Sequence, residues 1–407
     1  MILAAFAAMA VKYGEVVLSL RYRKTSSRSP GTAMSYLVHG IGGRGGGICA
    51  GIFAVLCLLA AVTVGSTVQA NAISESMTIT GLLPAGVTGC VLVVLALSVV
   101  LRGGGAVSRV VFRLVPFMTG GYLLLCFLVI FRHIAAVPAV CLSIFRGAFS
   151  GKGIGGGLLY FLTSPALRAG VSKGLLSNEA GCGTAPMAHA TSDTAYPARQ
   201  GLYGILEVFT DTVLLCTLTA FSVLTVFPEG LPEGLSGMSV LTAAFQSVFG
   251  AAAPVLLAGS IAVFAFATIL CWGFYLEKCM SWFTSNKKIH TAAKILYCFL
   301  LLPGAILPMQ KIFQATDLVL AAMTALNLFS ILWLAREVQA ESRRFGLLPP
   351  AEKKDAIGSR KKGKKESVAS RVFSRESSGV FCQDAISKYR KGKHELPESS
   401  CRKSKRT

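Results

Sequence analysis

Long stretches without a charged residue restrict most strongly what this chain can fold into. A helix that crosses a bilayer needs about 20 mainly apolar residues. Apolar residues make up 53% of the 407-residue chain and charged residues only 14%, whereas soluble domains carry about one quarter charged residues. A soluble enzyme, a collagen-like fibre and a fully disordered chain are therefore excluded. The charge-free stretches are Gly45–Ser74, Ser76–Leu101, Leu114–Phe131, Thr212–Pro228, Gly234–Leu276, Ile295–Gln310 and Leu318–Ala335.

These stretches predict an all-α polytopic membrane protein. Two further segments are predicted to cross the membrane, residues 1–20 and a polar, glycine-rich segment near 165–190. Together with the seven stretches above they give about nine spans. The stretch from Gly234 is too long for one span and is expected to hold a loop, an amphipathic piece around Val240–Phe249 and a span from Pro254. Four segments are predicted to be loops, and these are Lys24–Gly47, Arg102–Arg109, His133–Ser164 and Ser285–Thr291.

The formal net charge of +21 has two sources. Residues 341–407 hold 19 Lys+Arg and 8 Asp+Glu, and the other 340 residues carry the rest, mostly in loops on one predicted side. Because positive loops face the cytoplasm, we predict a transmembrane body at 1–340 and a basic, disordered cytoplasmic tail at 341–407. Such a tail binds anionic lipid. Its few aromatic residues argue against nucleic acid as a partner.

The chemistry is expected in the segment from Ser177 to Pro186. Two glycines and a proline interrupt an apolar helix there, which frees backbone N–H and C=O groups. At membrane depth, such groups are tolerated where they line a cavity or bind a ligand, and transporters use them to hold substrate and coupling ion. A kinked helix filled by its neighbours is the plainer alternative. Glu179 in the interruption and Asp211 on the next span favour function, because carboxylates inside a membrane are usually functional.

The run Lys173–Pro186, read KGLLSNEAGCGTAP, resembles the signature of the alanine or glycine:cation symporter family. The resemblance extends in order over nearly all of residues 1–340 and leaves the tail out. It is carried further by Lys12–Leu18, Arg21–Arg23, Val68–Asn71, Leu114–Met118, His189–Ala190, Pro197, Arg199–Leu202, Phe209, Asp211–Thr212, Phe264–Trp272 and Glu277–Cys279.

The resemblance implies a leucine-transporter-type inverted-repeat fold and sodium-coupled uptake of alanine, glycine or a similar small neutral amino acid across a bacterial inner membrane. Sodium would be the coupling ion, with no prosthetic group and no enzymatic activity. The resemblance also implies site residues. Substrate would meet Gln69, Asn178, Gly181, Gly183, Thr184 and Trp272, and the cation would meet Thr268, Asp211 and Thr212.

Three departures from the family pattern bear on this expectation. The match starts after the family's first two helices, one of them broken, which predicts a chain without that part of the site. Ala267 replaces a serine beside Thr268, and Glu207 replaces a glycine one helical turn before Asp211. Two alternatives therefore stay open. One is a non-transporting truncated remnant of such a symporter, and the other is a membrane-anchored module that acts through its basic tail.

Overall fold

A computed structural model describes residues 1–25, 29–149, 165–232, 234, 237–308 and 310–349, and every regular element in these ranges is helical. Residues Met1–Phe345 form one unit, and Gly346–Thr407 form a second, of which residues 346–349 are described. The prediction of a disordered tail is wrong at its start, because residues 341–344 are helical and Glu341 forms an ion pair with Arg21. From residue 350 the predicted tail lies outside the described residues. The all-α polytopic expectation is confirmed for the described part of the chain.

Seven helical segments are long and apolar enough to cross a membrane. Four of them are built from consecutive helices, and in three of these a π-helical turn or a short 3₁₀ turn joins the pieces. The first segments are α1 (Ile2–Arg21), α3 (Gly43–Ala60) with η2 (Ala61–Val68) and α4 (Gln69–Ile79), α6 (Gly104–Arg132), and α12 (Pro197–Val208) with η4 (Phe209–Leu215) and α13 (Cys216–Leu224). The others are α14 (Met238–Phe249) with η5 (Gly250–Ala252) and α15 (Ala253–Phe283), α16 (Lys287–Phe299) with α17 (Leu301–Ile306), and α18 (Gln310–Trp333).

Shorter helices complete the described fold. Two of these regions are apolar, α5 (Ala85–Val100) and the stretch made by η3 (Ile134–Ala136) and α7 (Val137–Phe149). The remaining short elements are α2 (Ala33–Tyr36), η1 (Leu37–Ile41), α10 (Pro165–Asn178), α11 (Ala185–His189) and α19 (Ala335–Arg344).

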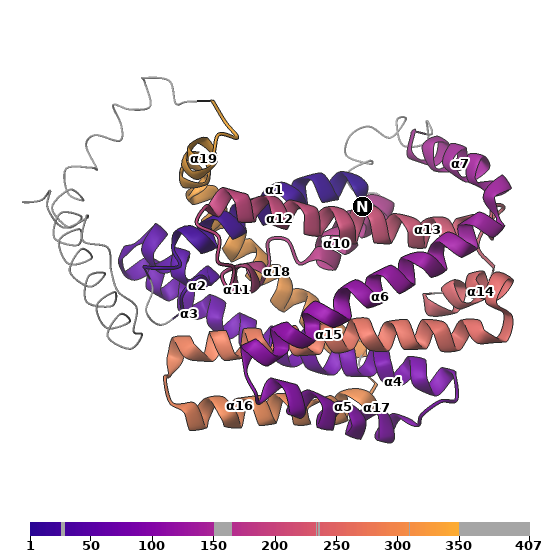
Figure 1. The fold of residues 1–407 in the computed structure, drawn as a ribbon, viewed down its shortest axis with the longest axis horizontal. Coiled ribbons are helices and arrows are strands. Elements are labelled where there is room, and N and C mark those ends of the chain that lie inside the picture. Colours follow the sequence, from indigo (N-terminus) through magenta and orange to yellow (C-terminus); the bar gives the residue numbers. More distant parts are fainter. Residues whose placement is uncertain (26–28, 150–164, 233, 235–236, 309, 350–407) are drawn as a thin grey trace, which may run out of the picture. The chain divides into compact units, whose positions relative to one another are not determined.

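Within the first unit, two packed groups of helices enclose the interrupted pair α10 and α11 (Figure 1). On one side α1 lies along α12 and contacts α10 and α11. On the other side α15 runs past α3, η2, α4 and α6, and α17 packs between α4 and α5. Among the described residues, the largest fully buried side chain is that of Trp272 on α15, and it belongs to a hydrophobic core cluster that also includes residues of α3, α5 and α18.

Several boundaries predicted from the sequence are confirmed and others are wrong. The interruption after Asn178 and the separate helix at Val240–Phe249 are found as predicted. The loop predictions are wrong for residues 33–41 and 43–47, which form α2, η1 and the start of α3, and for 104–109, which begin α6. They are also wrong for 134–149, which form η3 and α7, and for 287–291, which begin α16. Charged residues and glycines there lie at helix ends, where water can solvate them, so they do not stop the helix. Residues 150–164 lie outside the described part.

Gly304 shows how closely the helices of the core approach. A Cβ added to Gly304 would lie 2.7 Å from the Cα of Thr67 and 2.9 Å from its carbonyl oxygen. Backbone atoms cannot rotate away as a side chain can. The contact between α17 and η2 therefore requires a residue without a side chain at this position.

We predict that Gly304→Ala lowers the stability of the folded protein by about 1–3 kcal/mol, the usual cost of overpacking a core. The protein is heated in detergent to a series of temperatures, and size-exclusion chromatography measures how much folded protein remains. The loss of stability appears as a lower Tm. Gly86→Ala in α5 is the matched control, because a Cβ at Gly86 meets no atom within 4 Å. Equal Tm values for the two variants would contradict the close contact.

Candidate functional site

The interruption between α10 and α11 is built from backbone conformations that end one helix and start another. Helix α10 ends at Asn178 and α11 begins at Ala185. Glu179 follows the first helix in the left-handed region, at φ 52°, and is the one non-glycine residue with positive φ in the described chain. Left-handed backbone is costly for a residue with a side chain and clusters at functional sites. Gly181 and Gly183 also have positive φ, where glycine carries no such cost.

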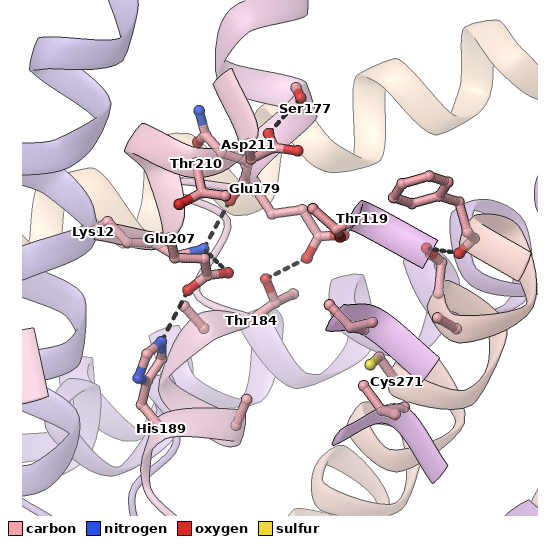
Figure 2. Close-up of a pocket in the computed structure, with 18 of the residues that line it drawn as sticks. Lys12, Thr119, Ser177, Glu179, Thr184, His189, Glu207, Thr210, Asp211 and Cys271 are labelled. Atoms are coloured by element: carbon pink, nitrogen blue, oxygen red, sulfur yellow. Dashed lines mark hydrogen bonds and ion pairs between the residues drawn. The ribbon is translucent and has the colours of Figure 1, made fainter. Parts of the chain in front are cut away.

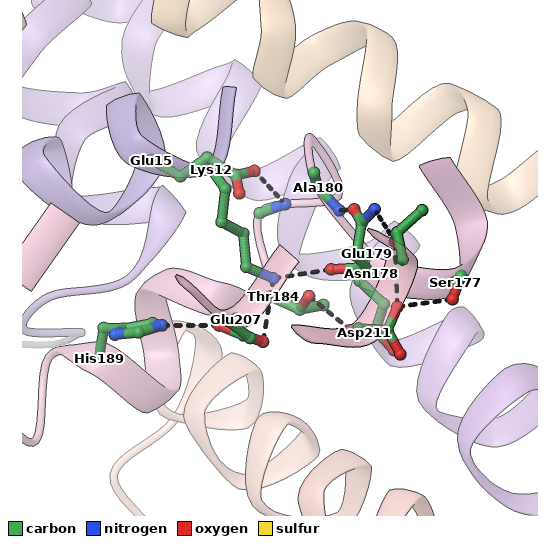
Figure 3. Close-up of polar contacts among 12 residues, drawn as sticks. Lys12, Glu15, Ser177, Asn178, Glu179, Ala180, Thr184, His189, Glu207 and Asp211 are labelled. Atoms are coloured by element: carbon green, nitrogen blue, oxygen red, sulfur yellow. Dashed lines mark hydrogen bonds and ion pairs between the residues drawn. The ribbon is translucent and has the colours of Figure 1, made fainter. Parts of the chain in front are cut away.

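Helix α1 supplies partners for the freed backbone groups (Figure 3). The Lys12 ammonium donates to the Asn178 carbonyl at 2.7 Å, and a Glu15 carboxylate oxygen accepts from the Gly183 N–H at 2.9 Å. Lys12 and Glu15 are 2% and 0% exposed, so these bonds are shielded from water. The second Glu15 oxygen has no hydrogen-bond partner. Asn327 of α18 completes the arrangement, because its amide donates to the Gly181 carbonyl at 2.8 Å and also to Glu15.

The Glu179 side chain holds the two ends of the interruption together. One carboxylate oxygen accepts from the Thr184 hydroxyl at 2.7 Å, and the other accepts from the Trp272 indole N–H at 3.2 Å. Trp272 is fully buried on α15. A Cβ at Gly65 of η2 would lie 2.2 Å from the Trp272 Cβ, so η2 presses directly on this indole. Glu179 thus links the interruption to α15 and, through Trp272, to η2.

A second series of polar contacts connects α1 with α12. Lys12 lies 3.3 Å from a Glu207 oxygen, and the other Glu207 oxygen lies 3.0 Å from Nε2 of His189. The Gln200 amide nitrogen donates to Nδ1 of His189 at 2.9 Å, while the Gln200 oxygen accepts from Ser192. An amide nitrogen can only donate. Nδ1 is therefore the accepting atom and Nε2 carries the proton that faces Glu207, without any need for a charged imidazole.

Asp211 lies on the π-helical turn η4, a kind of irregular turn that is frequent at functional sites. Its carboxylate accepts from the Ser177 hydroxyl at 2.6 Å and from the Thr212 hydroxyl at 3.2 Å. Thr212 is buried and also accepts from the Asn178 amide at 2.9 Å. The end of α10 and the π-helical turn are therefore joined by hydrogen bonds to the Asp211 carboxylate and to Thr212, and Asp211 also faces both cavities described below.

These groups line a cavity of about 580 Å³ (Figure 2). Glu179, Glu207 and Asp211 bring three carboxylates to it, against one ammonium, that of Lys12. Apolar walls come mainly from α6 and α15. The lining includes Val111, Val115, Met118, Thr119, Phe264, Ala267, Thr268, Cys271, Trp272 and Tyr275.

A second cavity of about 390 Å³ adjoins the first. Four lining residues are common to both cavities, and these are Asp211, Leu215, Phe264 and Thr268. Gln69 lines the second cavity and not the first. Asp211 and Thr268 therefore stand where the two spaces meet.

The structure brings most of the sequence-predicted site residues together. Asn178, Thr184, Trp272, Thr268 and Asp211 line the first cavity. The remaining predicted residues lie at its margin, with Gln69 in the second cavity, Thr212 behind Asp211, and Gly181 and Gly183 engaged with Asn327 and Glu15.

Sequence reasoning did not assign roles to Lys12, Glu15 and Asn327, which hold the interruption in place. Lys12 and Glu15 carried a usable signal, because two charges inside an apolar helix are expensive in a membrane and need partners. Nothing in the sequence distinguishes Asn327 from any other polar residue in a predicted span. Within the described residues, no group of three or more His, Cys, Asp or Glu side chains is arranged to hold a metal ion.

Comparison with known proteins supports the resemblance found in the sequence. A family model described as the sodium:alanine symporter family matches residues 1–356. The sodium/alanine symporter AgcS of Methanococcus maripaludis is 31% identical over 86% of this chain and 78% of that relative. The amino-acid carrier protein AlsT of Bacillus subtilis is 30% identical over 86% and 75%, and the probable sodium/glutamine symporter GlnT of the same species is 31% identical over 70% and 59%.

We predict that Lys12→Met destabilises the protein by about 1–3 kcal/mol, because it leaves the buried Asn178 carbonyl without its donor. A lower Tm in detergent is the measurement. Lys288→Met, at an exposed position on α16, is the matched control and is expected to leave the Tm unchanged. Equal Tm values for the Lys12→Met variant and the unchanged protein would show that the ammonium does not support the interruption.

Proposed function

The chain belongs to the sodium:alanine symporter family, and from this premise we propose that it is a secondary transporter that couples the uptake of alanine or glycine to sodium. The observation that supports this most strongly is the interrupted helix pair α10 and α11 at the wall of a 580 Å³ cavity. Cavities of this size suit small ligands. Interrupted helices at membrane depth are the usual place where transporters hold substrate and ion.

In the proposed fold, α10 and α11 form the broken helix that opens the second of two inverted repeats. The short helix α5 and the α10–α11 pair would then join the seven longer segments, which gives nine spans. Residues 1–340 would form the transporting body in the inner membrane, and 341–407 a basic tail that binds anionic lipid.

For the substrate, we place the amino acid beside Asn178, Thr184 and Trp272. Its ammonium group would meet the excess of negative charge from Glu179, Glu207 and Asp211, and its small side chain would meet the apolar walls from α6 and α15. Gly181 and Gly183 would shape this site through their backbone, since no side chain at either position fills the turn. Gln69 would contact substrate that passes through the second cavity.

For the cation, we propose the junction of the two cavities. Oxygen ligands suit a hard cation, and Asp211 and the hydroxyl of Thr268 supply oxygens at that point, with Thr212 behind them. A sodium ion there would tie the π-helical turn η4 to α15. Because these two elements belong to different packed groups of helices, the ion would link the groups and thereby couple its own binding to alternating access.

Uptake into proteoliposomes tests the function itself. We expect an inward sodium gradient to drive accumulation of labelled alanine or glycine by the purified chain, with no accumulation in a potassium gradient. Unlabelled alanine, glycine and glutamine, each in excess, would show which one competes. Absence of sodium-driven uptake of both labelled alanine and labelled glycine would contradict the proposal and favour a non-transporting protein.

Glu179→Gln should reduce that uptake at least about tenfold, because it removes a charge that faces the substrate and weakens the bonds to Thr184 and Trp272. Glu277→Gln is the matched control. Glu277 forms an ion pair with Lys294 at 2.8 Å and lines neither cavity, so uptake should remain.

Thr268→Ala tests the cation site. We expect the sodium concentration for half-maximal uptake to rise about tenfold, which corresponds to about 1.4 kcal/mol of lost binding, while uptake recovers at high sodium. Thr63→Ala is the control, since the hydroxyls of Thr63 and Thr268 both donate to the carbonyl four residues earlier, and Thr63 lines neither cavity. An unchanged sodium dependence in Thr268→Ala would remove Thr268 from the site.

A further inference from the structure

A groove separate from the two cavities lies where α5 ends and α6 begins. It has a volume of about 540 Å³. Ser98 and Val99 of α5 and Arg102 of the α5–α6 connection line one part of it. The rest of the lining comes from α6 and consists of Ala106 and five apolar or basic residues. Those five are Arg109, Val110, Arg113, Leu114 and Phe117.

The groove concentrates positive charge that the protein does not neutralise. Arg102, Arg109 and Arg113 are all exposed, and none forms an ion pair with a carboxylate among the described residues. Arg109 makes one hydrogen bond, to the Gly105 carbonyl at 3.2 Å. Arg109 and Arg113 are one helical turn apart and therefore lie on the same face of α6. Three guanidinium groups that converge on one groove favour a phosphate or another polyoxygen anion.

The position of the groove along α6 points to a membrane lipid as the source of that anion. From Leu114 to Phe131 the helix carries no charged residue, a length of about 27 Å at about 1.5 Å per residue. That length nearly matches a hydrocarbon core of about 30 Å. Arg113 and Arg132 stand at the two ends of this charge-free segment, and Arg102 and Arg109 precede it along the chain.

The same groove continues toward the hydrocarbon core as an apolar surface. Val110, Leu114 and Phe117 follow one another along one face of α6. Phe117 is 83% exposed and lies one turn into the charge-free segment that follows Arg113. A soluble anion would leave this apolar side unused, whereas a lipid would cover both parts of the groove.

We propose that this groove, lined by Arg102, Arg109 and Arg113, binds an anionic glycerophospholipid whose phosphate lies among the arginines and whose acyl chain packs on Val110, Leu114 and Phe117. The site is distinct from the basic tail, because it belongs to the folded helices α5 and α6. The neighbouring face of α6 carries Val111, Val115 and Met118 into the central cavity. A bound lipid would therefore fix the helix that forms one wall of that cavity.

Lipid binding to the delipidated full chain tests the proposal by native mass spectrometry. We expect phosphatidylglycerol to bind the unchanged protein at least about tenfold more tightly than phosphatidylcholine, and R109Q/R113Q to lose about thirtyfold of the phosphatidylglycerol affinity. The double variant R132Q/R146Q removes two other exposed arginines, outside the groove, and should retain binding. Equal affinities for the two lipids, or equal losses in the two variants, would overturn the proposal.

Glycerol 3-phosphate serves as the soluble arm of the same experiment. If it binds as tightly as phosphatidylglycerol, the acyl chain contributes nothing and the lipid assignment is wrong. Cross-linking of a photoactivatable phosphatidylglycerol to the unchanged protein tests the site without any variant. We expect cross-links within residues 99–117, and cross-links confined to other parts of the chain would refute the site.

Discussion

The need to satisfy backbone polar groups inside a membrane is the constraint on which the rest of this structure depends. An interrupted helix frees N–H and C=O groups where no water can pair with them, and each unpaired group costs several kcal/mol. Here α1 provides the partners, because Lys12 and Glu15 reach the two ends of the interruption. Charges in an apolar helix are themselves costly. The helix and the interruption therefore need each other, which explains why α1 packs against α10, α11 and α12.

The same contacts arrange the charges of the central cavity. Lys12 holds Glu207 as well as the Asn178 carbonyl, so this carboxylate, which stands where the resemblance leads one to expect a glycine, has an ionic partner. His189 holds its other oxygen. Glu179 is engaged with Thr184 and Trp272. Among the described residues, Asp211 accepts hydrogen bonds only from two hydroxyl groups and has no cationic partner. It lies where the two cavities meet.

Helix α6 connects this cavity with the membrane surface. One face lines the cavity, and the neighbouring face forms the arginine groove beside α5. Arg102 lies in the connection before α6, as expected, whereas Arg109 was expected in a loop and lies with Arg113 in the first turns of α6, a 29-residue helix. In the proposed arrangement α6 would contact both substrate and lipid, and a shift of this helix at one site would then reach the other.

The amino-acid sequence is sufficient to predict a helical, polytopic chain, because charge-free stretches of about 20 residues are stable as helices inside a bilayer. It also determined the interruption at Ser177–Pro186, because glycine and proline act on the local backbone whatever their surroundings. It pointed to Asp211 as a carboxylate inside an apolar span, and it pointed to Thr268 and Trp272 only through family resemblance. Tertiary structure alone decided the partners. Lys12 and Asn178 are 166 residues apart and Glu15 and Asn327 are 312 apart, and which distant side chains meet depends on how whole helices pack, a property that no local pattern encodes.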